Sequence, residues 1–186
     1  MSGAYLTNHF LIAMPSLADP NFSQTVTYLC EHSADGAIGI VINRPTDLTL
    51  GELFDHLQIA TTDPAVRKKH VFLGGPVQRE RGFVLHRPSG HWDSSLRVSE
   101  EITLTTSKDV LNAIAAGNGP SEYLIALGYA GWGPGQLEEE MAANSWLNGP
   151  ADADIIFGRP VDLRWQAAAA LLGVDLSLLS SVAGHA

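Results

Sequence analysis

The residues of this sequence best suited to chemistry are a cysteine and a histidine two positions apart, in 30-CEH-32. A strand places alternate residues on one face, so Cys30 and His32 are expected on one face and Glu31 on the other. An imidazole beside a thiol can lower the thiol pKa and produce a hydrolytic nucleophile. Against this, such residues lie roughly 6 to 7 Å apart at the backbone, and no oxyanion donor or third orienting residue is evident. The competing interpretation is a buried structural cysteine with a histidine at the rim of the core.

A second polar group, 43-NRP-45, follows an apolar segment. Asn43 and Arg44 are therefore expected where a strand enters a loop, and Pro45 stiffens the exit. The Arg44 guanidinium could bind a carboxylate or phosphate bidentately, or it could cap loop carbonyls or pair with an acidic neighbour. We expect His32, Asn43 and Arg44 to meet in a shallow pocket that binds a small ligand or a partner's backbone.

The glycine-rich segment 128-GYAGWGPGQLEEE-140 leads from a predicted strand into a predicted helix, as phosphate-binding loops do. It lacks the lysine and hydroxyl residue of a Walker loop and the spacing of a dinucleotide fingerprint. Three glutamates in the first helical turns would also repel a phosphate. Only Gln136 and Glu140 share a helix face, and no histidine is spaced as a metal ligand. The sequence therefore predicts neither a metal site nor a cofactor.

Composition limits the class of protein. A chain of 186 residues with 45% hydrophobic and 17% charged residues can bury a core of its own, and we expect one domain over residues 1–186. The first fifteen residues lack the basic start and apolar stretch of an export signal, and no apolar run approaches bilayer length. The single cysteine cannot form an internal disulfide. These features favour a cytoplasmic protein.

Partners are constrained by charge. The formal net charge of −9 repels phosphate backbones and anionic lipid, and no predicted helix presents a basic face to a DNA groove. The one basic run, 67-RKKH-70, is expected in a solvated loop. Direct DNA binding and membrane binding are therefore not expected, and the partner is expected to be a small molecule or a protein.

Hydrophobic periodicity predicts the elements that position these residues. Thr49 and Glu52 form a capping box before Leu50, Leu53, Phe54 and Leu57, which recur at helical spacing. Elsewhere, alternation and turn residues indicate strands, and caps and glycine stops indicate helices. The predicted strands are 25–32, 37–42, 70–74, 82–86, 101–105, 122–127 and 153–157, and the predicted helices are 49–57, 107–116, 136–147 and 162–172. This order favours an α+β fold with a mixed, largely antiparallel sheet layered with helices.

Several long segments, in this order, resemble the AlgH/YqgE family of bacterial proteins. They are 11-LIAMPSLADPNFSQTVTYLCEH-32, 36-GAIGIVINRP-45, 72-FLGGPVQRERGFVLH-86, 104-LTTSKDVLNAIAAGNGP-120, 127-LGYAGWGPGQLEEEMAANSWL-147 and 157-FGRPVDLRWQAAAALLG-173. The resemblance implies a compact α/β layered fold in the bacterial cytosol. It implies little chemistry, because the family is largely uncharacterised and its transcriptional-regulator label derives from a genetic association with alginate production.

The resemblance also implies which positions could form a family site. Ser33 departs from the family pattern, which often has asparagine there. The function predicted is a regulatory or interaction protein with a small-ligand pocket; the alternative is a hydrolase that uses Cys30 and His32. The candidate binding positions are Cys30, Glu31, His32, Asn43, Arg44, Pro45, Gly74, Gly75, Pro76, His86, Gly131, Trp132 and Arg159.

Overall fold

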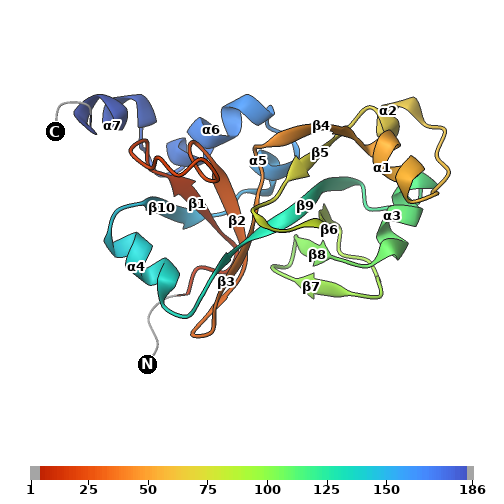
Figure 1. The fold of residues 1–186 in the computed structure, drawn as a ribbon, viewed down its shortest axis with the longest axis horizontal. Coiled ribbons are helices and arrows are strands. Elements are labelled where there is room, and N and C mark those ends of the chain that lie inside the picture. The colour runs from red at the N-terminus through yellow and green to blue at the C-terminus, as the bar shows by residue number, and fades with distance from the viewer. Residues whose placement is uncertain (1–4, 184–186) are drawn as a thin grey trace.

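The computed structural model describes residues 5–183, which form strands and short helices (Figure 1). The strands are β1 (His9–Ala13), β2 (Val26–Ser33), β3 (Gly36–Val41), β4 (Pro45–Thr49), β5 (His70–Leu73), β6 (Val77–Arg87), β7 (Ser95–Arg97), β8 (Thr103–Thr105), β9 (Glu122–Trp132) and β10 (Trp146–Pro150). The helices are α1 (Leu50–His56), α2 (Pro64–Arg67), α3 (Lys108–Ala115), α4 (Gln136–Ala142), α5 (Ala153–Phe157), α6 (Arg164–Ala170) and α7 (Leu176–Ala183), with a 3-10 turn at Val161–Leu163. Within residues 5–183, no helix is long and apolar enough to span a bilayer.

Strand β9 is the centre of the architecture. The sheet runs in the order β10-β1-β2-β3-β9-β6-β8-β7, and β4 and β5 join it through a β5–β9 contact. That contact is parallel, whereas the other ladders are antiparallel. In Figure 1, β9 crosses the middle of the molecule, with β1, β2, β3 and β10 toward one end and β6, β7 and β8 toward the other. The predicted α+β class and largely antiparallel sheet are confirmed.

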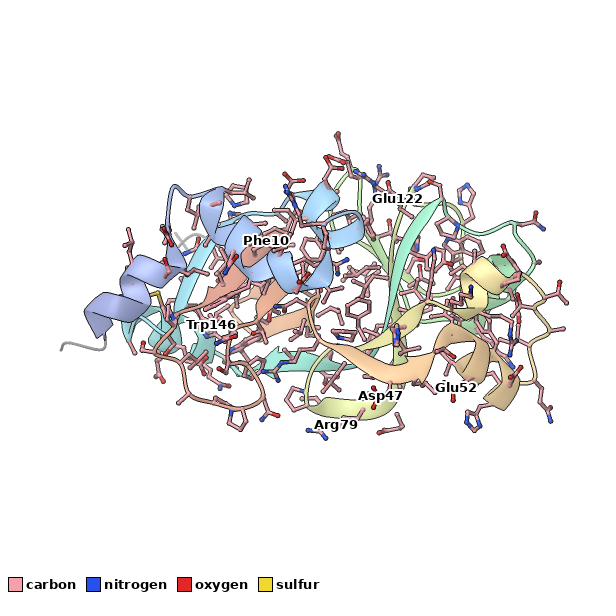
Figure 2. All side chains as sticks on the ribbon, turned by 90° about the horizontal axis from the view of Figure 1, so that it is seen from above. Phe10, Asp47, Glu52, Arg79, Glu122 and Trp146 are labelled. Carbon is pink, nitrogen blue, oxygen red and sulfur yellow. The ribbon has the colours of Figure 1, made fainter. Side chains whose placement is uncertain are left out.

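Three hydrophobic clusters occupy the spaces between this sheet and the helices. The largest cluster brings Phe10, Tyr28 and Leu85 against residues of α5, α6 and α7. In Figure 2, which looks onto α6, Phe10 lies at this helix. A second cluster, around Trp132 and Leu137, lies under α4. The third cluster packs apolar residues of α1 and α3 on the other part of the sheet. Burial of one leucine- or phenylalanine-sized side chain adds about 1.5–3 kcal/mol to the free energy of unfolding.

The predicted capping box at Thr49 is present. The Thr49 hydroxyl accepts a hydrogen bond from the Glu52 amide at 3.2 Å, and the Glu52 carboxylate accepts one from the Thr49 amide at 3.1 Å. The hydrogen bond from the Thr49 amide, and a further one from the Thr49 hydroxyl at 3.0 Å, lower the pKa of the Glu52 carboxyl. Two of the four otherwise unpaired amides at the start of α1 are thereby satisfied, so the helix begins at Leu50 as the pattern indicates.

Two sequence predictions about the elements are wrong. Residues 153–157 form helix α5 rather than a strand, because the Asp152 carboxylate accepts a hydrogen bond from the Asp154 amide and caps a helical turn. The helix predicted over 136–147 ends at Ala142, and Asn144 adopts a left-handed conformation (φ 60°). The chain then enters β10, which pairs with β1. Over segments this short, the spacing of the apolar Ile and Leu residues is compatible with both the helix period of 3.6 residues and the strand period of two.

Candidate functional site

The strand-end residues Asn43 and Arg44 hold the protein's own chain. Arg44 donates hydrogen bonds from its guanidinium to the carbonyls of Pro20 (2.6 Å) and Ser23 (2.9 Å). The Asn43 side chain accepts a hydrogen bond from the Val26 amide at 2.9 Å. Burial lowers the pKa of Arg44. Of the two interpretations of Arg44, the structure therefore shows the capping of loop carbonyls, here in the segment before β2.

A bulge in β2 separates the cysteine from the histidine. Between Leu29 and Glu31 the register of β2 on β3 shifts by one, so that two residues of β2 face one of β3. Cys30 consequently packs in the large cluster with Tyr28, whereas His32 faces α4 on the other side of the sheet. The expectation that Cys30 and His32 share a face is wrong, because an extra residue reverses the alternation.

The Cys30 thiol has the environment of a structural residue. Its side chain is buried, and Sγ donates a weak hydrogen bond to the Tyr28 carbonyl at 3.7 Å. Burial, and secondarily the charge of Glu31, raise the pKa of the thiol far above its usual value. A neutral, enclosed thiol is a poor nucleophile. This geometry does not favour the hydrolase alternative.

His32 is hydrogen-bonded to the segment before β1 and lies against α4, and it does not contact Cys30 as an activating base would. Its Nδ1 accepts a hydrogen bond from the Leu6 amide at 2.9 Å, so the ring proton lies on Nε2. Nε2 lies 3.3 Å from the Glu138 carboxylate of α4. His32 pairs with Ala37 at the turn of the β2–β3 hairpin, whereas Asn43 bonds to Val26 at its other end. Six residues of strand separate the two places by roughly 20 Å, so the predicted pocket of His32, Asn43 and Arg44 does not form.

The 74-GGP-76 motif forms a close backbone crossing. A Cβ on Gly75 would overlap the carbonyl of Tyr129, and a Cβ on Gly74 would overlap the carbonyl of Gly128. Gly128 itself adopts φ 77° and is in contact with Gly75. Glycine is required where the segment before β6 crosses β9 this closely, because any side chain would force the two backbones apart. These glycines shape the crossing.

Trp132 is one of three side chains that donate hydrogen bonds to the carboxylate of Glu140 on α4. Glu140 accepts hydrogen bonds at 3.0 Å from the indole N–H groups of Trp132 and Trp146. Its second oxygen accepts one from Gln136 at 3.0 Å, as expected for residues that share a helix face. The glutamate therefore joins α4 to β9 and β10, which gives the aromatic and acidic residues of the glycine-rich segment a structural role.

His86 is buried in a chain of hydrogen bonds. Its Nδ1–H donates to the Pro88 carbonyl at 3.0 Å, and Nε2 accepts from the Thr105 hydroxyl at 2.7 Å. The Thr105 oxygen lies 2.8 Å from the Ser95 hydroxyl. Burial lowers the pKa of His86. The ring is thus held neutral between β6 and β8 as a structural bridge.

The remaining candidates are scattered over the surface. Arg159 is exposed and contributes its carbonyl to the buried guanidinium of Arg164, whose pKa is lowered to about 10 by burial. Pro45 is exposed on β4. The structure does bring together Glu31, Gly131 and Trp132, which line an open depression of about 390 Å³ beside the hairpin turn. Pro76 lies next to the glycine crossing. Whether any of these positions binds a ligand stays a prediction.

The sequence predictions did not include a cluster of charged side chains that centres on Arg87. Its guanidinium contacts Glu122 (2.6 Å), Asp154 (3.0 Å) and Glu101 (3.1 Å). Its hydrogen bonds with Glu122 and Asp154 raise the pKa of Arg87. A signal was present: Arg87 follows a predicted strand, and both glutamates lie at the start of predicted strands. Antiparallel pairing of these strands brings the three ends together, with Arg87 opposite Glu122.

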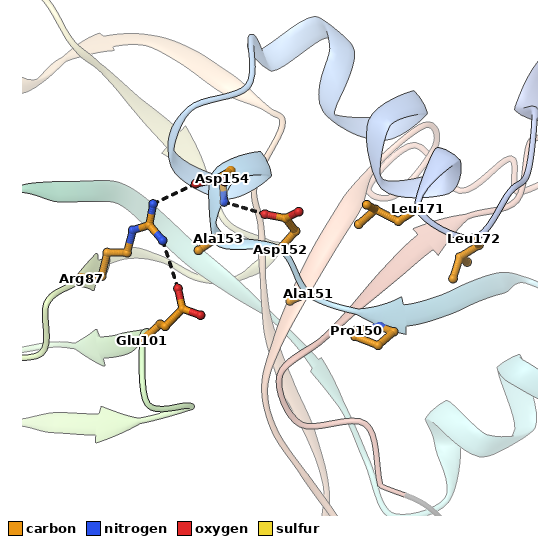
Figure 3. A pocket seen from close by; sticks show the side chains of 9 residues that line it. All are labelled: Arg87, Glu101, Pro150, Ala151, Asp152, Ala153, Asp154, Leu171 and Leu172. Carbon is orange, nitrogen blue, oxygen red and sulfur yellow. Dashed lines mark hydrogen bonds and ion pairs between the residues drawn. The ribbon is translucent and has the colours of Figure 1, made fainter.

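Arg87 and two of its partners, Glu101 and Asp154, line a groove (Figure 3). The groove has a volume of about 440 Å³; Glu101 and Asp154 lie beside Arg87, and Asp152 lies between them and the leucines. Leu171 and Leu172 lie on the opposite side, with 50% and 37% of their surface exposed. The groove therefore combines carboxylates in excess of cations with apolar surface. Within residues 5–183, no group of three or more His, Cys, Asp or Glu side chains could hold a metal.

Comparison with known proteins identifies the family. The AlgH-like family model matches residues 10–177, which is most of the chain. The chain belongs to the AlgH-like family. Among the AlgH-like proteins it resembles, a UPF0301 protein of Nitrosococcus oceani is 57% identical over 182 residues, covering 98% of this chain and 97% of that protein. A UPF0301 protein of Thioalkalivibrio sulfidiphilus is 61% identical over 180 residues, covering 97% and 96%. The family resemblance seen in the sequence is confirmed.

Solved structures agree with the AlgH-like assignment. The solution structure of the AlgH protein from Pseudomonas aeruginosa matches with a TM-score of 0.81 and 53% identity, over 97% of this chain and 95% of that one. A crystal structure of a Corynebacterium diphtheriae protein matches with a TM-score of 0.76 at 19% identity, over 97% and 94%, and so shows the fold alone. Both comparisons support the AlgH-like fold and leave its activity open.

Proposed function

We propose that this AlgH-like protein acts by binding a protein partner, and that the groove beside Arg87 receives a basic, amphipathic segment of that partner. One observation carries the proposal: a carboxylate-rich wall faces two exposed leucines across a single groove. Complementary potentials steer association and select partners, while apolar contact supplies affinity.

The charges on the acidic wall are not neutralised internally. Arg87 contributes one positive charge, while Glu101, Asp152 and Asp154 contribute three negative charges at the groove. The side chains of Glu101 and Asp154 are 68% and 83% exposed, so both remain available to a second cation. The net charge of −9 adds attraction for a basic partner and repels nucleic acid.

The leucine wall determines the form of the partner. Leu172 packs against Gly149 of β10, where a Cβ would meet the leucine side chain, and Leu171 extends beside it. A ligand that satisfies both walls needs apolar and cationic side chains on adjacent stripes, which is the pattern of an amphipathic helix. The groove volume admits a few side chains of such a helix, so the helix itself would lie across the opening.

The test uses a synthetic helical peptide with one leucine face and one lysine face. Backbone amide shifts of the protein are followed by NMR during titration, and saturable shifts are expected at residues 151–154 and 171–172. The double variant Glu101→Gln with Asp152→Asn is expected to bind several-fold to about tenfold more weakly at low salt. Asparagine at 152 still caps α5, so the fold is retained.

A matched control removes two carboxylates elsewhere, with Asp47→Asn and Glu139→Gln, both on exposed residues. This control should bind as the wild type does. A second peptide carries glutamate in place of lysine and should not bind. Equal binding of the acidic peptide, equal loss in the control variant, or shifts confined to another face would each refute the proposal.

A further inference from the structure

A second cavity lies between α1 and α3, over the part of the sheet formed by β6, β8 and β9. Its volume is about 210 Å³. A dry cavity of about 150 Å³ lined by aliphatic and aromatic side chains is large enough for benzene. The space between α1 and α3 is therefore of the right size for one ring, or a branched chain, with a short substituent.

The floor of this cavity is apolar and comes from four elements. Helices α1 and α3 supply the outer walls, and strands β6 and β9 supply the base. The apolar lining residues are Leu53, Leu57, Val84, Leu111, Ile125 and Leu127. Water in such a cavity would find few polar partners, so an apolar group can replace it at a gain in free energy.

The mouth of the cavity carries charges of the sign opposite to the whole molecule. Arg81 and Lys108 line it with a single carboxylate, Glu80. The Lys108 ammonium contacts the Leu57 carbonyl at 3.4 Å, and the Arg81 guanidinium contacts the Gln78 amide oxygen at 3.5 Å. Among the described residues, neither cation has a carboxylate within ion-pair distance.

Hydroxyl groups complete the mouth at the start of α3. Thr106 and Ser107 line the cavity, and Ser107 donates a hydrogen bond to the Asp109 carboxylate at 2.5 Å. That carboxylate also accepts a hydrogen bond from the Asp93 amide, so its charge is held by the protein's own donors. These bonds lower the pKa of Asp109 against the effect of burial. Among the described residues, two cations without a carboxylate partner therefore remain beside an apolar cavity. The Arg81 guanidinium also lies 5.5 Å from the centroid of the Phe83 ring.

We propose that the cavity between α1 and α3 binds a small carboxylic acid with an aromatic or branched aliphatic body. The apolar body enters the floor, and the carboxylate lies between Lys108 and Arg81. This cavity shares no lining residue with the Arg87 groove, so ligand binding here does not depend on the proposed partner binding.

The test uses 3-phenylpropionate as the probe, with its uncharged amide as the isostere. Titration is followed by NMR of the leucine and isoleucine methyl groups, and saturable shifts are expected at Leu111 and Ile125. The carboxylate should bind about tenfold more tightly than the amide, as expected for a charge-assisted hydrogen bond. The double variant Arg81→Gln with Lys108→Gln should lose about this factor.

The control variant is Arg79→Gln with Lys68→Gln. Arg79 belongs to the same exposed 78–81 segment as Arg81 but does not line the cavity, and Lys68 is exposed after α2. This control should bind the probe as the wild type does. Absence of a saturable shift up to about 10 mM, equal affinity for acid and amide, or equal loss in the control would overturn the proposal.

Discussion

Replacement of Glu140 by alanine is expected to destabilise the protein severely. The wild-type carboxylate accepts the indole N–H groups of Trp132 and Trp146 with one oxygen, and the Gln136 amide with the other. The two tryptophans are only 6% and 4% exposed. In Glu140→Ala both indole donors lose their acceptor in a place that water hardly reaches.

The size of the destabilisation follows from the two indole N–H groups that lose their acceptor. A buried donor without an acceptor costs about 1–3 kcal/mol, so the pair should lower the free energy of unfolding by about 2–6 kcal/mol. Glu140→Gln keeps an acceptor oxygen and should lose less than half of that. In a Trp146→Phe background, where one donor is already absent, Glu140→Ala should cost about 1–3 kcal/mol less than in the wild type.

Urea unfolding followed by far-UV circular dichroism measures these values, because tryptophan fluorescence would itself change with the substitution. Glu139→Ala is the control, since it removes an exposed carboxylate from the same helix and should cost less than about 1 kcal/mol. Equal costs for the Glu140 and Glu139 variants, or no coupling with Trp146, would show that the cluster does not join α4 to the sheet.

Three further predictions test other features. Gly75→Ala should cost at least about 3 kcal/mol in urea unfolding, because its methyl group would overlap the Tyr129 carbonyl. Cys30 should react with iodoacetamide at least about a hundredfold more slowly in the folded protein than in urea, because its thiol is buried and its pKa is raised. Burial lowers the pKa of His86, so the unfolded chain takes up the proton first on acidification. Stability from this group is present above about pH 6.5 and is lost below it, with a slope of up to about 1.4 kcal/mol per pH unit that His86→Gln should remove.

Each of these has a contradicting result. Gly82→Ala is the control for Gly75→Ala, because a Cβ on Gly82 meets nothing within 4 Å. An equal loss of unfolding free energy in the two variants would contradict the close crossing of the backbones. Rapid labelling of Cys30 in the folded protein would restore the hydrolase alternative. An unchanged slope of stability between about pH 5 and 7 in the His86 variant would mean that other groups cause it.

Local patterns predicted those parts of the fold whose cause is local. The Thr49 box and the spacing after it specify α1, because both concern neighbouring residues. The hairpin 25–42 and the glycine stops are similarly short-range. The apolar residues of β10 and α5 fit both the strand and the helix period. Pairing with β1, which is non-local, selects the strand in β10, whereas the cap at Asp152 is a local signal for α5 that the prediction overlooked.

The candidate site was harder to predict because its geometry is non-local. One inserted residue at Cys30 moves His32 to the other face of the sheet, and nothing in 30-CEH-32 announces the bulge. Arg44 was correctly placed at a strand end, but its partners are carbonyls whose position depends on the loop before β2. The Arg87 cluster required the strand register, which the sequence alone leaves open.

Strand β9 is hydrogen-bonded to β3, β5 and β6, so it belongs to the sheet on both sides of the molecule. A fragment that stops before residue 122 would present three strands with an empty edge. We therefore expect that the protein cannot be cut into two halves that each fold, and that the amide protons of β9 exchange with solvent only when the whole chain opens.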